Sequence, residues 1–100
     1  MKTYNIFAGI DKAIFIKSDK FKNEESALEF AKKEAIKLYE EQEADVWKDL
    51  LIEAEQNIDP NNFDDLEDWA NALENWADEA LIKDKLIRIK YFVTNDLSSN

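Results

Sequence analysis

The side chains best suited to chemistry lie in one stretch, FDDLEDWANALENWADEA, which spans residues 63–80. It holds seven carboxylates between Asp64 and Glu79, two tryptophans seven residues apart, and no basic residue. Carboxylates attract cations and basic protein surfaces, and tryptophan adds cation–π contact with arginine. The candidate partner-binding residues are therefore Asp64, Asp65, Glu67, Asp68, Trp69, Glu74, Trp76, Asp78 and Glu79.

Catalysis is not expected from this composition. The chain has no histidine and no cysteine, which removes the usual general base, the commonest metal ligand and the thiolate nucleophile. The segment DPNNFDDLEDWA fails as a calcium loop, because Phe63 stands where an oxygen ligand is needed and Ala70 replaces the bidentate glutamate. We therefore expect no enzymatic activity, no metal and no cofactor.

The charge of the chain is strongly uneven. The net charge is −10, and residues 49–82 hold 11 acidic residues and no basic one. Such a chain is repelled by nucleic acid and by anionic membranes, so the expected partner is a basic protein surface. No apolar run is long enough for a secretory signal or a membrane span, which predicts a cytoplasmic protein.

The acidic stretch predicts an amphipathic helix over residues 62–82, capped by Asn61 or Asn62. At 100° per residue all seven carboxylates fall on one half of the helix. They are spaced at about 3.4 Å per charge along the axis, close to the phosphate spacing of one DNA strand. The expected buried stripe on the other half consists of Phe63, Leu66, Ala70, Leu73, Ala77, Ala80 and Leu81.

Trp69 and Trp76 fall at the edge of that stripe, and two interpretations stay open. Both are core residues whose indole N–H points toward solvent, or both are half-exposed anchors that border the acidic face.

The surrounding pattern predicts a small α+β domain. TYNIFA and AIFIK alternate as strands joined through residues 9–12, Asn23 caps a helix, and a break is expected near residues 41–44. The order is β-β-α-α-α-β, a three-stranded antiparallel sheet with helices packed on one face, in a single compact domain over residues 1–100. The predicted strands lie near 3–8, 13–18 and 85–94, and the helices near 24–40, 44–57 and 62–82.

In size, charge, absence of Cys and His, and its FDDLEDWANALENWADEAL helix, the chain resembles the small acidic inhibitors encoded by bacteriophages. These are the anti-CRISPR and DNA-mimic anti-restriction proteins. The resemblance implies stoichiometric inhibition, in which carboxylates occupy the basic nucleic-acid site of a nuclease, with a CRISPR effector nuclease as the leading target. It also implies action in the cytoplasm of a bacterial host.

Two alternatives stay open. One is a structural or regulatory homo-oligomer, such as a homodimer, in which the tryptophan-edged face packs against a second copy. The other, ranked last, is an enzyme that uses carboxylates alone, since nothing supplies a tuned nucleophile or base.

Overall fold

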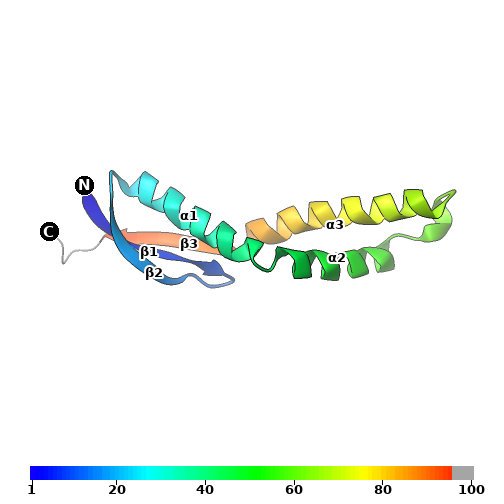
Figure 1. The fold of residues 1–100 in the computed structure, drawn as a ribbon, viewed down its shortest axis with the longest axis horizontal. Coiled ribbons are helices and arrows are strands. Elements are labelled where there is room, and N and C mark those ends of the chain that lie inside the picture. Colours follow the sequence, from blue (N-terminus) through cyan, green and yellow to red (C-terminus); the bar gives the residue numbers. More distant parts are fainter. Residues whose placement is uncertain (96–100) are drawn as a thin grey trace. The chain divides into compact units, whose positions relative to one another are not determined.

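The computed structural model describes residues 1–95 of the 100-residue chain. The elements follow the predicted order, and the α+β class with a three-stranded antiparallel sheet is confirmed (Figure 1). They are β1 (Lys2–Ile10), β2 (Ile14–Phe21), α1 (Glu24–Glu40), α2 (Glu43–Asn57), the 3₁₀ helix η1 (Pro60–Asn62), α3 (Leu66–Arg88) and β3 (Ile89–Asn95).

The contacts within the chain divide it into two units. The first contains the sheet and α1 and runs from Met1 to Glu41 and again from Ile87 onward. The second is Gln42–Leu86, which contains α2, η1 and most of α3. The single compact domain over residues 1–100 stays a prediction.

In the first unit the sheet has the strand order β2-β1-β3, and α1 covers one of its faces. Tyr4, Ile6 and Ala8 of β1 are buried on that face. They are apolar at alternate positions, as a half-buried strand requires. Helix α1 presents Ala27, Ala31 and Ala35 to the core, all at 0% exposure, and these small side chains allow close approach of the helix to the strands.

The ends of α1 follow the predicted local signals. The Asn23 side chain accepts a hydrogen bond from the Ser26 backbone N–H at 2.8 Å, which satisfies a free donor of the first turn. The helix ends at Glu40, and α2 begins at Glu43. The predicted break is confirmed.

The connection between β1 and β2 differs from the predicted one, because β1 continues through Gly9 and Ile10 and the turn occupies residues 11–13. Asp11 takes the left-handed conformation, with φ of 64°. Gly9 is required for space, since a Cβ there would collide with the carbonyl oxygen of Lys12. The turn is held by Arg88, whose guanidinium bonds both carboxylate oxygens of Asp11 at 3.2 Å.

The third helix and third strand also begin later than the sequence pattern suggested. Pro60–Asn62 form the separate helix η1, so α3 begins at Leu66 and not near residue 62. At the other end, α3 continues to Arg88, and β3 begins at Ile89 and not near residue 85. The alternation of apolar residues around Leu86 was typical of a strand, but helical hydrogen bonding persists through it.

Within β3 the alternation holds, with Ile89 buried and Tyr91 and Val93 half-buried on the α1 side. None of the helices within residues 1–95 combines the length and apolar character needed to traverse a bilayer.

Candidate protein-interaction surface

The acidic helix α3 forms an antiparallel helical hairpin with α2 in the second unit (Figure 1). Three side chains form its core, with Ala54 and Ala77 at 0% exposure and Leu73 at 5%. Polar contacts join the two helices around this core. The Trp47 indole N–H donates to Asp78 at 2.9 Å, and Lys85 pairs with Glu43 at 3.5 Å.

Trp69 and Trp76 are half-buried and lie on the stripe of α3 that contains its core residues. The Trp69 indole N–H donates to the Ile58 carbonyl at 3.0 Å and so fixes the segment that leaves α2. This hydrogen bond gives Trp69 a structural role, which favours the first of the two interpretations at that position. For Trp76 no indole hydrogen bond is found within residues 1–95.

The buried stripe of α3 is rotated from the predicted one. Leu66 is 73% exposed and Ala70 is also exposed, whereas Ala72, which the sequence interpretation omitted, is half-buried. The observed stripe follows the helical spacing i, i+3, i+4, i+7. Its members are Trp69, Ala72, Leu73, Trp76, Ala77, Ala80 and Leu81, of which Leu73, Ala77, Ala80 and Leu81 were predicted. The seven-residue spacing of the tryptophans was the signal that could have located it.

All seven predicted carboxylates are exposed, and two of them have structural partners. Asp65 caps α3 by accepting the Asp68 backbone N–H at 2.8 Å, so the predicted cap at Asn61 or Asn62 is wrong. Asp78 accepts the Trp47 indole. In the part of the chain that the structure describes, the other five side chains have no hydrogen bond or ion pair: Asp64, Glu67, Asp68, Glu74 and Glu79.

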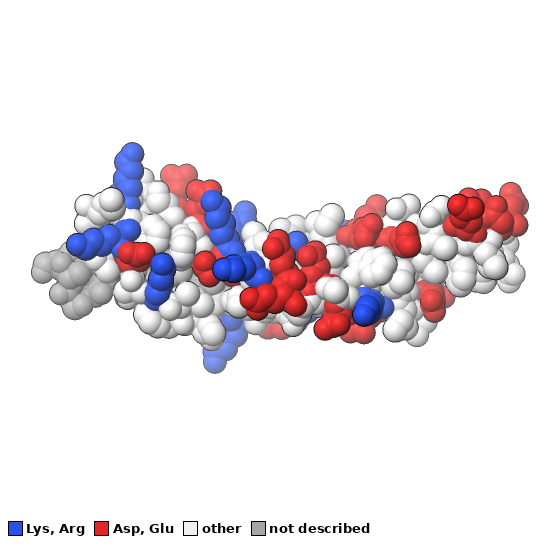
Figure 2. Space-filling view, in the orientation of Figure 1, with Lys and Arg blue, Asp and Glu red and all other residues white. Residues whose placement is uncertain are grey.

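The second unit carries essentially all of the net charge. Residues 42–86 contain 14 acidic and 3 basic residues, a net charge of −11, against +1 for the rest of the chain. Red side chains are frequent over α2 and α3 in Figure 2, and most blue ones lie over the unit with the sheet. Among residues 1–95, no group of three or more acidic side chains is arranged to hold a metal ion.

Comparison of the chain with family models, with curated proteins and with solved structures finds no match. The chemistry of the hairpin surface therefore indicates which partner the protein suits. That surface is a helix side with exposed carboxylates, five of which have no partner within residues 1–95, and this suits binding to a cationic macromolecule.

Proposed function

We propose that this protein is a stoichiometric inhibitor that binds the basic, nucleic-acid-binding surface of a host nuclease through the acidic side of α3. The observation that carries the proposal is the set of five exposed carboxylates that have no hydrogen bond or ion pair within the described residues 1–95, on a unit of net charge −11. The protein acts without catalysis, metal or cofactor in this proposal.

The charge arrangement favours a basic partner for an energetic reason. Glu74 and Asp78 are four residues apart on α3, and like charges at this spacing cost a few tenths of a kcal/mol. No lysine or arginine lies between residues 49 and 82 to offset the repulsion. Contact with arginine and lysine side chains of a partner would remove this cost and speed association by electrostatic steering.

A CRISPR effector nuclease in the cytoplasm of a bacterial host is the first target to assay. Its guide and target strands occupy positively charged channels, and an acidic helix can compete for such a channel. Five of the carboxylates lie on α3, between Glu67 and Glu79, at about 3.9 Å per charge along the axis, close to the phosphate spacing of about 3.4 Å along one DNA strand.

The alternative of a homodimer through the tryptophan-edged face is less favoured. Both indoles are half-buried in the hairpin, and the Trp69 N–H is already bonded to Ile58. The two rings therefore offer a partner less apolar area than the sequence suggested.

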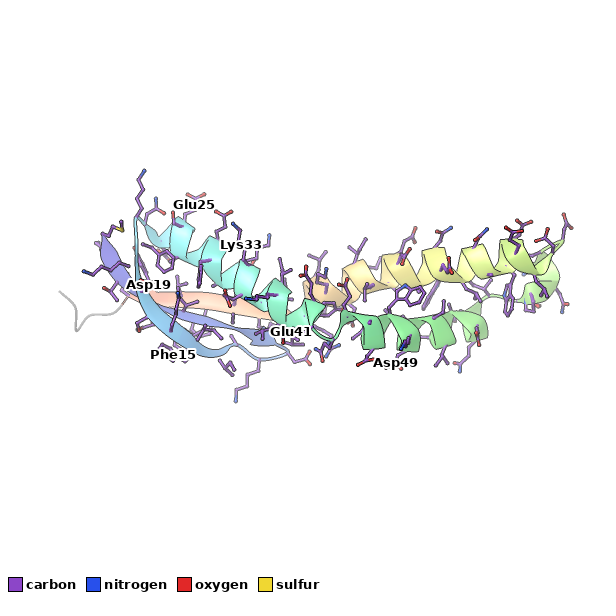
Figure 3. All side chains as sticks on the ribbon, in the orientation of Figure 1. Phe15, Asp19, Glu25, Lys33, Glu41 and Asp49 are labelled. Atoms are coloured by element: carbon purple, nitrogen blue, oxygen red, sulfur yellow. The ribbon has the colours of Figure 1, made fainter. Side chains whose placement is uncertain are left out.

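The test compares inhibition of the nuclease by the wild-type protein and by a triple charge reversal on α3, namely Glu67→Lys, Asp68→Lys and Glu74→Lys. These side chains have no partner within residues 1–95, so the hairpin should stay folded. The matched control reverses three exposed carboxylates of α2: Asp49→Lys, Glu53→Lys and Glu55→Lys. Asp49 points away from α3 in Figure 3.

Both triple variants change the net charge by the same six units, so a difference in inhibition between them cannot come from net charge alone. We expect wild-type protein and the α2 variant to inhibit at one equivalent, with affinity that falls steeply as salt rises, and the α3 variant to lose inhibition. Undiminished binding of the α3 variant, or equal loss in both variants, would contradict the proposed surface.

A further inference from the structure

The two edges of the sheet are protected to different extents. On β2 the register shifts opposite Ile6 and Phe7, and charged side chains Lys17, Asp19 and Lys20 follow the edge. Bulges and charges of this kind prevent another strand from pairing. The opposite edge, β3, is seven residues long, contains Lys90 as its single charged residue, and shows no register shift against β1.

The sequence of β3 is complementary to itself when run antiparallel about Phe92. In that register Phe92 faces its own copy, Tyr91 faces Val93, and Lys90 faces Thr94. Tyr91 and Val93 both lie on the α1 side of the sheet and pack against its core. No two like charges are placed opposite each other, and every pair joins side chains on the same face.

An aromatic row on the other face of the sheet ends at the same edge. Phe15, Phe7 and Phe92 are directly opposite one another on β2, β1 and β3. Their ring centroids are 5.6 Å apart for Phe15–Phe7 and 4.4 Å for Phe7–Phe92. Phe92 remains 43% exposed, so one side of the last ring in the row has no aromatic neighbour within residues 1–95.

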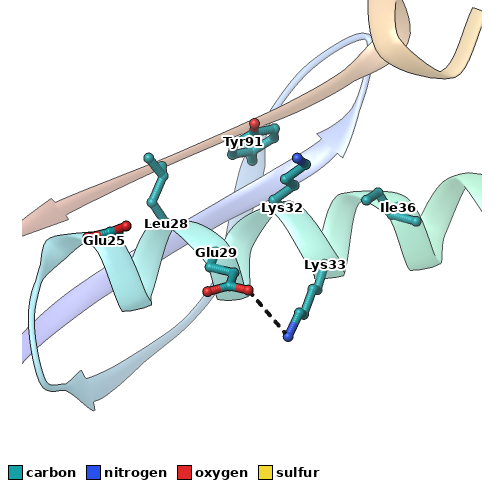
Figure 4. Close-up of a pocket in the computed structure, with 7 residues that line it drawn as sticks. All are labelled: Glu25, Leu28, Glu29, Lys32, Lys33, Ile36 and Tyr91. Atoms are coloured by element: carbon teal, nitrogen blue, oxygen red, sulfur yellow. Dashed lines mark ion pairs between the residues drawn. The ribbon is translucent and has the colours of Figure 1, made fainter.

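On the α1 face, a hollow of about 460 Å³ lies beside α1 and Tyr91 (Figure 4). Its apolar residues are Leu28, Ile36 and Tyr91, and its charged residues come from α1. Acidic Glu25 and Glu29 precede basic Lys32 and Lys33 along the helix, and Glu29 and Lys33 form an exposed ion pair with each other at 3.7 Å. An antiparallel copy of α1 would therefore place its acidic half beside the basic half of the first.

We infer that a second copy of this chain pairs with the β3 edge in antiparallel register about Phe92, which gives a twofold dimer with a six-stranded sheet. Helix α1 lies over β1 and β3 to an equal extent. With strands about 4.8 Å apart, the two α1 helices would lie about 10 Å from each other. Helices in contact pack at 8–10 Å, so the two hollows would be filled by the facing side chains.

The self-matching register and the acidic-then-basic order along α1 both favour a second copy over an unrelated extended peptide. A peptide would need only the backbone edge, whereas the twofold dimer uses the edge, the end of the aromatic row and the hollow together. This inference concerns the first unit and does not depend on the proposed role of the acidic hairpin.

The first test is a cross-link, for which the chain is well suited because it has no cysteine. Residues directly opposite in an antiparallel pair have Cα atoms about 4.5–5.5 Å apart, within the range of a disulfide. We expect Phe92→Cys to form a disulfide-linked dimer under oxidation with copper–phenanthroline. The matched variant Thr94→Cys, on the same face, should not, because its two copies would be about 14 Å apart.

The second test is the mass in solution, measured by sedimentation equilibrium with the full chain. We expect twice the monomer mass of 11.7 kDa for wild type. Phe92→Lys would place two lysines opposite each other and should weaken dimerisation about tenfold or more. Phe15→Lys, which alters the 56% exposed ring at the other end of the row, should leave the dimer intact.

A charge swap on α1 covers the case in which Phe92→Lys fails to fold. Lys32→Glu should weaken the dimer, and adding Glu25→Lys should restore it, and both variants keep the Glu29–Lys33 ion pair within the helix. A monomeric wild type, equal cross-linking at positions 92 and 94, equal loss with Phe15→Lys, or no rescue by the swap would overturn the inference. Inhibition by the acidic hairpin could survive each of these results, so the two proposals fail separately.

Discussion

The hydrogen bond from Trp69 to Ile58 provides a direct measure of how the helical hairpin is held together. Trp69→Phe keeps a large aromatic ring but removes the indole N–H that donates at 3.0 Å to the Ile58 carbonyl. A typical hydrogen bond contributes about 1 kcal/mol, and a half-buried carbonyl left without a donor adds to the loss. We expect the free energy of unfolding to fall by about 1–2 kcal/mol.

Trp76→Phe is the matched control, because it makes the same change in ring size on the same stripe of α3. Within residues 1–95 the Trp76 indole N–H has no acceptor, so only the smaller ring should change the free energy of unfolding. Urea unfolding followed by far-UV circular dichroism gives both values, and their difference isolates the hydrogen bond at about 1 kcal/mol. Equal costs for the two variants would refute the structural role assigned to Trp69.

Three further predictions concern single positions. Asp65→Ala should cost about 1 kcal/mol through loss of the α3 cap, whereas its neighbour Asp64→Ala should change stability by less than about 0.5 kcal/mol in urea unfolding. Ala31→Leu should lower the free energy of unfolding by about 1–3 kcal/mol, because Ala31 is fully buried between α1 and the sheet, and a tolerated leucine would disprove close packing there. Hydrogen bonds from the Lys20 backbone and the Lys17 side chain lower the pKa of Asp19. The small contribution of Asp19 to stability is therefore present above its unfolded pKa and is lost as the pH falls through the lower folded pKa. NMR titration should find the pKa of Asp19 below that of an ordinary aspartate.

Some elements of the fold could be predicted from the sequence more accurately than others. Strong local signals located β1, β2 and α1, because the alternation of Tyr4, Ile6 and Ala8 and the cap at Asn23 act within a few residues. The boundary between α3 and β3 could not be located in this way. Residues 85–88 suit either a strand or a helix, and in the structure Lys85 lies in α3 and pairs with Glu43, which is far away in the chain.

Some features of the candidate site likewise follow from the sequence, and others depend on the tertiary structure. The number of carboxylates between residues 64 and 79 and the lack of nearby bases are properties of the sequence. Which of those carboxylates have partners is not, because Asp78 meets Trp47 only after α2 and α3 pack together. The rotation of the buried stripe away from Leu66 and Ala70 also arises from that packing.

The sequence by itself determined the α+β class, the order of elements and the concentration of negative charge between residues 49 and 82, since each follows from local pattern and composition. The tertiary structure decided which side chains have hydrogen-bond or packing partners and which remain exposed. It placed the Trp69 N–H on Ile58 and joined Phe15, Phe7 and Phe92 across three strands. The physical reason is that such partners are brought together by strand register and helix packing, which are set by burial over the whole unit and not by neighbours in sequence.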